Sequence, residues 1–167
     1  MRKERYLLRK NWSNLRTLIA AVISENKISE ENFRSLSTNE NWKQIEKNIV
    51  KEFCSYPKKS RWLWNNFKLD TFSTSSLANR PEYCLDKLIE EKETVWYIVN
   101  ETINEKDKFW FYEGKIKTIQ TIIDETWFDE IYIASKKYEW LIVINHHDII
   151  IATGKTMPDK LRKLDFK

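Results

Sequence analysis

The sequence predicts an α+β fold in which N-terminal helices precede an antiparallel sheet of about five strands, ordered β-β-α-β-β-β-α, with helices packed on the sheet. Two observations support this fold class. Apolar residues recur at three- and four-residue steps in the first half of the chain, whereas aromatic and β-branched residues dominate short segments from Thr94 onwards. Connections between successive strands are too short for a parallel crossover, so neighbours are expected to pair antiparallel. We expect one domain, residues 1–167, with a mainly helical half (1–92) and a sheet half (93–167).

The first predicted elements are helical. Apolar residues at helical spacing from Trp12 to Ile23 predict an amphipathic helix that faces a core. A short helical turn is expected after Ser29, through Phe33 and Leu36.

A second long helix is predicted after Ser37. Ser37 and Glu40 have the spacing of a capping box, and apolar residues continue one helical face over residues 42–53. Residues 56–76 contain a proline, a basic cluster and a Ser/Thr tract, which indicate a loop-rich connection around a short aromatic segment. Pro81 then marks the start of another helix.

The second half contains the predicted strands. We expect residues 94–99 and 108–113 to form an antiparallel hairpin. Gly114 is expected to end its second strand, and the apolar spacing of residues 115–125 again predicts a helix. The last two strands are apolar on both faces, so we expect them to lie centrally in the sheet. The remaining strands are predicted at residues 129–135, 138–144 and 149–154, and a final helix begins near Thr156.

Composition excludes several classes of protein. With only two glycines, the chain cannot build a Gly-rich phosphate loop or a dinucleotide fingerprint. No segment approaches the roughly 20 apolar residues of a membrane-spanning helix, and the charged N-terminus does not have the pattern of a signal peptide. Cys54 and Cys84 stand alone, so we expect free, partly buried thiols. A soluble, cytoplasmic protein without a membrane partner is therefore expected.

The charge is unevenly distributed along the chain. Residues 1–83 carry 16 Lys and Arg against 9 Asp and Glu, a net charge of +7. Residues 84–167 carry 13 against 16, a net charge of −3, and the whole chain is at +4. This polarity can steer a charged partner, but neither half is extreme enough to diagnose nucleic-acid binding.

Both histidines of the chain lie in the segment INHHDIII, residues 144–151. His146, His147 and Asp148 carry groups that bind metals, but neighbouring side chains on a continuous strand point to opposite faces. Asn145 and Asp148 are turn-favouring residues on either side of a two-residue loop. We therefore predict a hairpin turn that presents both imidazoles to solvent or a partner, and metal binding by His146 and His147 is a third functional hypothesis.

Glu113 and Lys115 form a Glu-x-Lys pattern at the end of a predicted strand. In metal-dependent nucleases with this spacing, the acid holds the ion and the lysine steadies the attacking water. Such a site needs an upstream aspartate, and Asp107 or Asp86 would have to serve. Short charged patterns arise readily by chance in a chain with 32% charged residues.

Two acidic pairs, at residues 124–125 and 129–130, carry the paired carboxylates that acid–base chemistry uses. They flank Trp127 and Phe128. We interpret them as a solvated rim beside these aromatic residues rather than as a catalytic pair.

The segment PKKSRWLWNNF, residues 57–67, combines positive charge with aromatic faces. This combination suits single-stranded nucleic acid or an acidic protein partner that accepts an aromatic anchor. The alternative is that the aromatic residues pin a loop to the core while the lysines stay solvated. The candidate partner-binding residues in this segment are Lys58, Lys59, Arg61, Trp62 and Trp64.

The run from Asp107 to Gly154 contains the segments YEGKI, SKKYEWL and NHHD. It resembles the C-terminal core of a family of small bacterial proteins known as a domain of unknown function. The resemblance implies a bacterial origin and a fold, and it brings no established activity with it. In size and layout, small α+β proteins of this kind resemble immunity proteins that neutralise polymorphic toxins, which is an analogy of class.

The sequence shows no assembled catalytic constellation, so we expect no catalytic residues, no cofactor and no metal. We expect a cytoplasmic bacterial protein that binds another protein, as an immunity-type inhibitor of a toxin encoded nearby, and acts by occlusion. Trp62 or Trp64 would be the buried anchor, and His146 and His147 would be further contacts. The alternative is a nucleic-acid-binding protein or metal-dependent nuclease that uses the basic N-terminal half and Glu113-x-Lys115.

Overall fold

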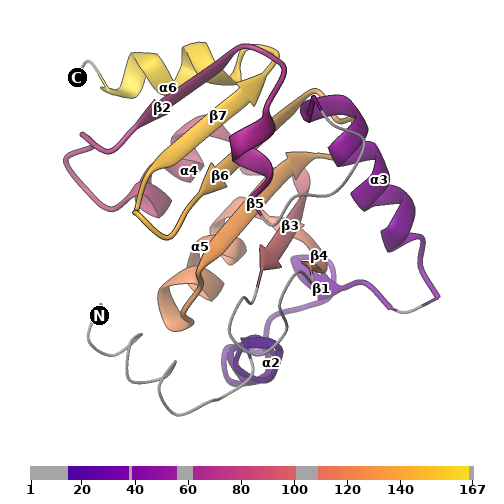
Figure 1. Ribbon diagram of the computed structural model, residues 1–167. Coiled ribbons are helices and arrows are strands. Elements are labelled where there is room, and N and C mark those ends of the chain that lie inside the picture. The colour runs from indigo at the N-terminus through magenta and orange to yellow at the C-terminus, as the bar shows by residue number, and fades with distance from the viewer. Residues whose placement is uncertain (1–14, 38, 56–61, 101–108, 166–167) are drawn as a thin grey trace.

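Seven strands form one antiparallel sheet in the computed structural model, which describes residues 15–37, 39–55, 62–100 and 109–165. The sheet order is β1-β4-β3-β5-β6-β7-β2, with β1 at one edge and β2 at the other (Figure 1). The predicted α+β class and antiparallel pairing are confirmed, and the number of strands is corrected from five to seven. The strands are β1 Phe33–Ser35, β2 Thr71–Thr74, β3 Thr94–Asn100, β4 Phe109–Lys115, β5 Glu130–Ser135, β6 Trp140–Ile144 and β7 Ile150–Gly154.

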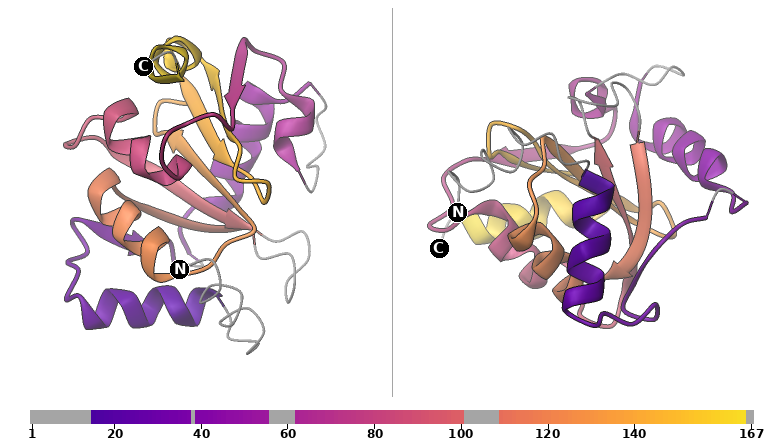
Figure 2. Two further views of the ribbon diagram at one scale, coloured as in Figure 1. Left: turned by 90° about the vertical axis from the view of Figure 1, so that its left-hand side faces the viewer. Right: turned by 90° about the horizontal axis from the view of Figure 1, so that it is seen from below.

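Helices cover both faces of the sheet (Figure 2). One face carries α3 and the short 3-10 helix η1, and the other carries α2, α4, α5 and α6. The bounds are α2 Leu15–Glu25, α3 Trp42–Phe53, η1 Leu63–Asn66, η2 Pro81–Cys84, α4 Leu85–Leu88, α5 Ile116–Glu125 and α6 Met157–Asp165.

The two helical layers explain why the central strands are apolar on both sides. In β5, Tyr132 and Ala134 pack toward α3, whereas Ile131 and Ile133 pack into the larger core on the opposite face. Every residue of β5 and of β6 is buried. The strands β6 and β7 both lie inside the sheet, as predicted from their apolar sequences.

The strand β1 replaces the predicted helical turn through Phe33 and Leu36. Phe33 pairs with Gly114 of β4, which continues to Lys115 instead of ending at the glycine. A Cβ atom on Gly114 would lie 2.6 Å from Cδ2 of Phe33, so the missing side chain lets the aromatic ring pack against the strand. The pairing with a distant strand decides the conformation here, and the local sequence does not reveal it.

The helix α3 begins at Trp42, later than the capping-box spacing suggests. Asn41 is the N-cap residue and makes no side-chain cap bond. The Glu40 carboxylate does accept the Ser37 backbone N–H, with Oε2 at 2.7 Å, but its other interactions are with Arg34. The buried face of the helix, which includes Ile45, Ile49 and Phe53, is the one predicted.

The segment expected to be a loop-rich connection contains two ordered elements among its described residues. Leu63–Asn66 forms η1, and Thr71–Thr74 forms the edge strand β2, which pairs with β7. The backbone N–H of Lys68, between η1 and β2, donates to the carbonyl of Phe53 at 3.0 Å, which ties this segment to the end of α3. Among the residues that the structure describes, no helix combines the length and apolar character needed to cross a bilayer.

Candidate functional site

The turn between β6 and β7 is the hairpin turn predicted from Asn145 and Asp148, but its loop is longer than the two residues expected. The Asn145 N–H donates to the Ile149 carbonyl, so residues 146–148 form the loop. The side-chain oxygen of Asn145 accepts the backbone N–H groups of His147 at 3.0 Å and Ile149 at 3.2 Å. Asp148 adopts a φ of 59°, a left-handed conformation that Asp tolerates better than most residues. Asn145 is buried while His146, His147 and Asp148 are exposed, so a fixed turn presents both imidazoles at the surface.

Glu130 lies beneath this turn. It is the first residue of β5, and its side chain is 0% exposed. One carboxylate oxygen, Oε1, is 3.1 Å from Nδ1 of His146 and accepts the indole N–H of Trp64 at 2.9 Å. The other, Oε2, accepts the hydroxyl of Tyr132 at 2.6 Å. The carboxylate therefore connects the hairpin turn, the sheet and η1.

The short helix η1 brings the tryptophans to the same place. The backbone N–H of Leu63 donates to the Tyr132 hydroxyl at 3.2 Å, which fixes the start of η1 against β5. The Trp62 ring meets the His146 ring edge-on, with 5.5 Å between centroids and 77° between planes. We call the assembly the tip cluster; its members are Trp62, Trp64, Glu130, Tyr132, His146 and His147.

The structure thus brings together four of the seven residues proposed from sequence for partner binding: Trp62, Trp64, His146 and His147. The two tryptophans have different roles. The indole N–H of Trp64 donates to Glu130 inside the cluster, while the Trp62 ring contacts the His146 ring in a T-shaped arrangement. Lys58, Lys59 and Arg61 lie outside the described residues.

The sequence interpretation of residues 129–130 as a solvated rim is wrong, because Asp129 is 7% exposed and Glu130 is fully buried. Glu130 is the central residue that the sequence argument missed. It stands two positions before Tyr132 and four before Ala134, so period-two alternation places it on the face that packs toward α3. The alternation with Tyr132 and Ala134 is therefore the sequence pattern that identifies Glu130 as buried.

The electrostatics of the cluster favour one arrangement of protons. A carboxylate accepts hydrogen bonds, so the contact at Oε1 of Glu130 places a proton on Nδ1 of His146. In the neutral His146 imidazole, Nε2 then carries the lone pair, and this nitrogen does not take part in the contact with Glu130. Burial, together with the nearby charge of Glu130, raises the pKa of the Tyr132 hydroxyl, which therefore remains a hydrogen-bond donor.

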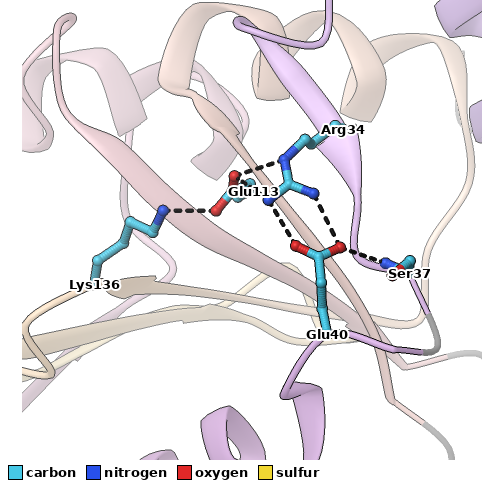
Figure 3. A network of polar contacts seen from close by, with 5 residues as sticks. All are labelled: Arg34, Ser37, Glu40, Glu113 and Lys136. Carbon is cyan, nitrogen blue, oxygen red and sulfur yellow. Dashed lines mark hydrogen bonds and ion pairs between the residues drawn. The ribbon is translucent and has the colours of Figure 1, made fainter.

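Glu113, the acid of the Glu-x-Lys pattern, belongs to a different network on the same face of the sheet (Figure 3). Its Oε1 accepts Nε of Arg34 at 2.8 Å, and its Oε2 is 2.6 Å from Nζ of Lys136. The Arg34 guanidinium also forms a two-bond pair with Glu40. We call this the Arg34 network; its members are Arg34, Ser37, Glu40, Glu113 and Lys136.

The contacts of the Arg34 network lower the pKa of Glu40 and occupy both carboxylate oxygens of Glu113. Hydrogen bonds from Arg34, and then from the Ser37 backbone, lower the pKa of Glu40 to about 2. Both oxygens of Glu113 are engaged by cations, so neither is presented as a metal ligand.

The other residues of the proposed nuclease pattern do not gather around Glu113. Nζ of Lys115 is 3.4 Å from Oε1 of Glu31. Asp86 belongs to α4, on the opposite side of the sheet, and pairs with Lys117. Asp107 lies outside the described residues. The described geometry therefore gives no support to a nuclease site at this pattern.

Among the described residues, no group of three or more His, Cys, Asp or Glu side chains is arranged to hold a metal ion. Cys54 and Cys84 are both free, as predicted, and both are buried where partial burial was expected. Burial raises the pKa of each thiol to about 11. These thiols therefore stay protonated near neutral pH and are poor nucleophiles.

The comparisons with known proteins agree with the resemblance seen in the sequence. The family described as "Family of unknown function (DUF6756)" matches residues 11–165. The chain belongs to this family. No curated protein and no solved structure matches it. Membership covers almost the whole chain and not only the C-terminal core.

Proposed function

We propose that this protein works by binding another protein through the surface of the tip cluster. The observation that supports the proposal is the way Trp62, His146 and His147 are placed: their rings adjoin at the surface above a fully buried carboxylate. Aromatic side chains in a preorganised setting are common binding hot spots, because little conformational entropy is lost when a partner covers them.

The finer proposal is a cytoplasmic bacterial immunity-type protein that inhibits a toxin by covering its active surface. It is supported by the small α+β fold and by the analogy of size and layout with immunity proteins. The net charge of +7 on residues 1–83 favours a partner with an acidic surface and disfavours a strongly basic nuclease. Trp62 would be the anchor, and the imidazoles would set the register of the contact.

The test is co-expression with the product of the adjacent gene, followed by affinity capture and measurement of the dissociation constant. Trp62→Ala and His147→Ala are each expected to weaken binding at least about tenfold, the effect of losing a hot-spot residue. Tyr83→Ala is the matched control, since Tyr83 is an exposed aromatic residue on η2, away from the tip cluster.

Recovery of no complex would remove the main support for the immunity proposal. A complex weakened equally by Tyr83→Ala would show that the tip cluster is not the binding surface. If the chain instead binds single-stranded nucleic acid, and the binding weakens steeply with added salt, the nucleic-acid alternative replaces the proposal.

A further inference from the structure

The two imidazoles at the hairpin tip lie side by side. Their ring centroids are 4.0 Å apart, with 44° between the ring planes. On an extended strand, consecutive side chains point to opposite faces and cannot share an ion. The turn held by Asn145 removes this obstacle, because it places His146 and His147 next to each other on the exposed side of the molecule.

A second observation concerns the inner nitrogen of His146. Histidines that bind metals commonly donate their other ring N–H to a carboxylate, which fixes the tautomer and makes the metal-binding nitrogen more basic. His146 has this partner in Glu130, with Nδ1 3.1 Å from Oε1. Trp64 and Tyr132 hold the carboxylate in turn, so the orientation of the imidazole is built into the fold.

We propose that His146 and His147 form a binding site for one divalent transition-metal ion of the class that imidazole prefers, such as Zn²⁺, Ni²⁺ or Cu²⁺. Nε2 of His146 and a ring nitrogen of His147 are the protein ligands, and Glu130 is a positioning residue. No third His, Cys, Asp or Glu joins them among the described residues, so water completes the coordination. This site uses the same two imidazoles as the proposed protein binding, but the inference does not depend on that proposal.

The first experiment is calorimetric titration of the untagged full-length chain with ZnCl₂. One ion is expected to bind per chain. His146→Ala and His147→Ala should each weaken binding at least about tenfold, and Glu130→Gln by about 10- to 100-fold, the usual effect of removing such a carboxylate partner. His147→Ala changes an exposed turn residue, so it keeps the test valid if Glu130→Gln disturbs folding.

Two controls exclude other ligands. The double variant Cys54→Ser/Cys84→Ser should bind Zn²⁺ as the native chain does, because both thiols are buried and protonated. The native chain should also melt at a higher temperature with Zn²⁺ than with a chelator, and the His146→Ala/His147→Ala chain should not. Binding that survives loss of both imidazoles, or native binding weaker than about 1 mM, overturns the proposal.

Nitrogen-15 NMR of the two imidazoles tests the positioning role of Glu130 directly. In the metal-free chain, Nδ1 of His146 should carry the proton, and Glu130→Gln should reduce that preference while the fold remains intact. On adding ZnCl₂, the Nε2 resonance of His146 should shift while Nδ1 stays protonated. Coordination through Nδ1, with the Glu130 contact broken, would contradict the assignment.

Discussion

Two glutamates on the same face of the sheet show how differently one fold can use a carboxylate. Glu130 is aligned across β3 with Phe109 of β4, and Glu113 lies four residues further along β4, about 13 Å from Phe109 along the strand. Glu113 contacts two cations, whereas Glu130 contacts an indole, a hydroxyl and an imidazole.

This difference separates a structural role from a candidate functional role. Arg34 and Lys136 neutralise Glu113, and the resulting network joins β1 to β4 and to the turn after β5 (Figure 3). Among the described residues, no Lys or Arg pairs with Glu130, and the carboxylate contacts Trp64, Tyr132 and His146 instead. A carboxylate placed in this way orients the groups around it.

The largest expected effect comes from removing the Glu130 carboxylate, and removal of the Glu113 carboxylate is the comparison. Glu130→Ala should lower the free energy of unfolding by about 3 kcal/mol, because it leaves a cavity and removes the acceptor for Trp64 and Tyr132. Glu113→Ala should lower the free energy of unfolding by only about 1 kcal/mol, because Arg34 retains its ion pair with Glu40 and the Lys136 ammonium can be solvated by water. Urea unfolding measures both, and equal losses would contradict the contrast drawn between the two sites.

A smaller effect tests the second support of the tip cluster, the turn above Glu130. Asn145→Ala removes the acceptor of two backbone N–H groups and should cost about 1 to 2 kcal/mol of unfolding free energy. Asp148→Asn is the control, because Asn also tolerates the left-handed conformation, and its effect should stay within about 0.5 kcal/mol. An unchanged urea midpoint for Asn145→Ala would show that the turn does not depend on this side chain.

The fold was predictable where the signals are local. Alternating β-branched residues and short turns predicted β3 to β7, and helical spacing predicted α2, α3 and α5. The edge strands β1 and β2 were missed because each has only three or four residues and is defined by pairing with a distant strand. Phe33, for example, is a strand residue because it meets Gly114, 81 positions away in the sequence.

The same distinction applies to the tip cluster. Asn145 and Asp148 predicted the turn, since their effect on the backbone is local. Glu130 was misinterpreted because its partners Trp64 and His146 stand 66 and 16 positions away, and only the tertiary fold brings them to it. An acidic residue at the alternate positions that form the buried face of a strand is the pattern that would have indicated the buried role of Glu130.

The smallest effect concerns Glu40 and tests how the Arg34 network distributes its charge. The pKa of Glu40 is lowered from 4.5 to about 2, with the Arg34 hydrogen bond as the main cause. A lowered carboxyl pKa stabilises the folded chain above pH 4.5, and this contribution is lost as the pH falls from 4.5 to about 2. Carboxyl carbon-13 NMR near pH 4 should therefore show Glu40 ionised in the native chain and largely protonated only after Arg34→Gln.

Lys136→Met is the matched control for this titration, because Lys136 contacts Glu113 and does not contribute to the lowered pKa of Glu40. It should leave the Glu40 signal near pH 4 unchanged. If Arg34→Gln also leaves it unchanged, the Ser37 backbone N–H is the main cause of the lowered pKa. The charge of Arg34 would then act on Glu113 alone. This result would sharpen the contrast between Glu113, which pairs with cations, and Glu130, which is held by hydrogen bonds.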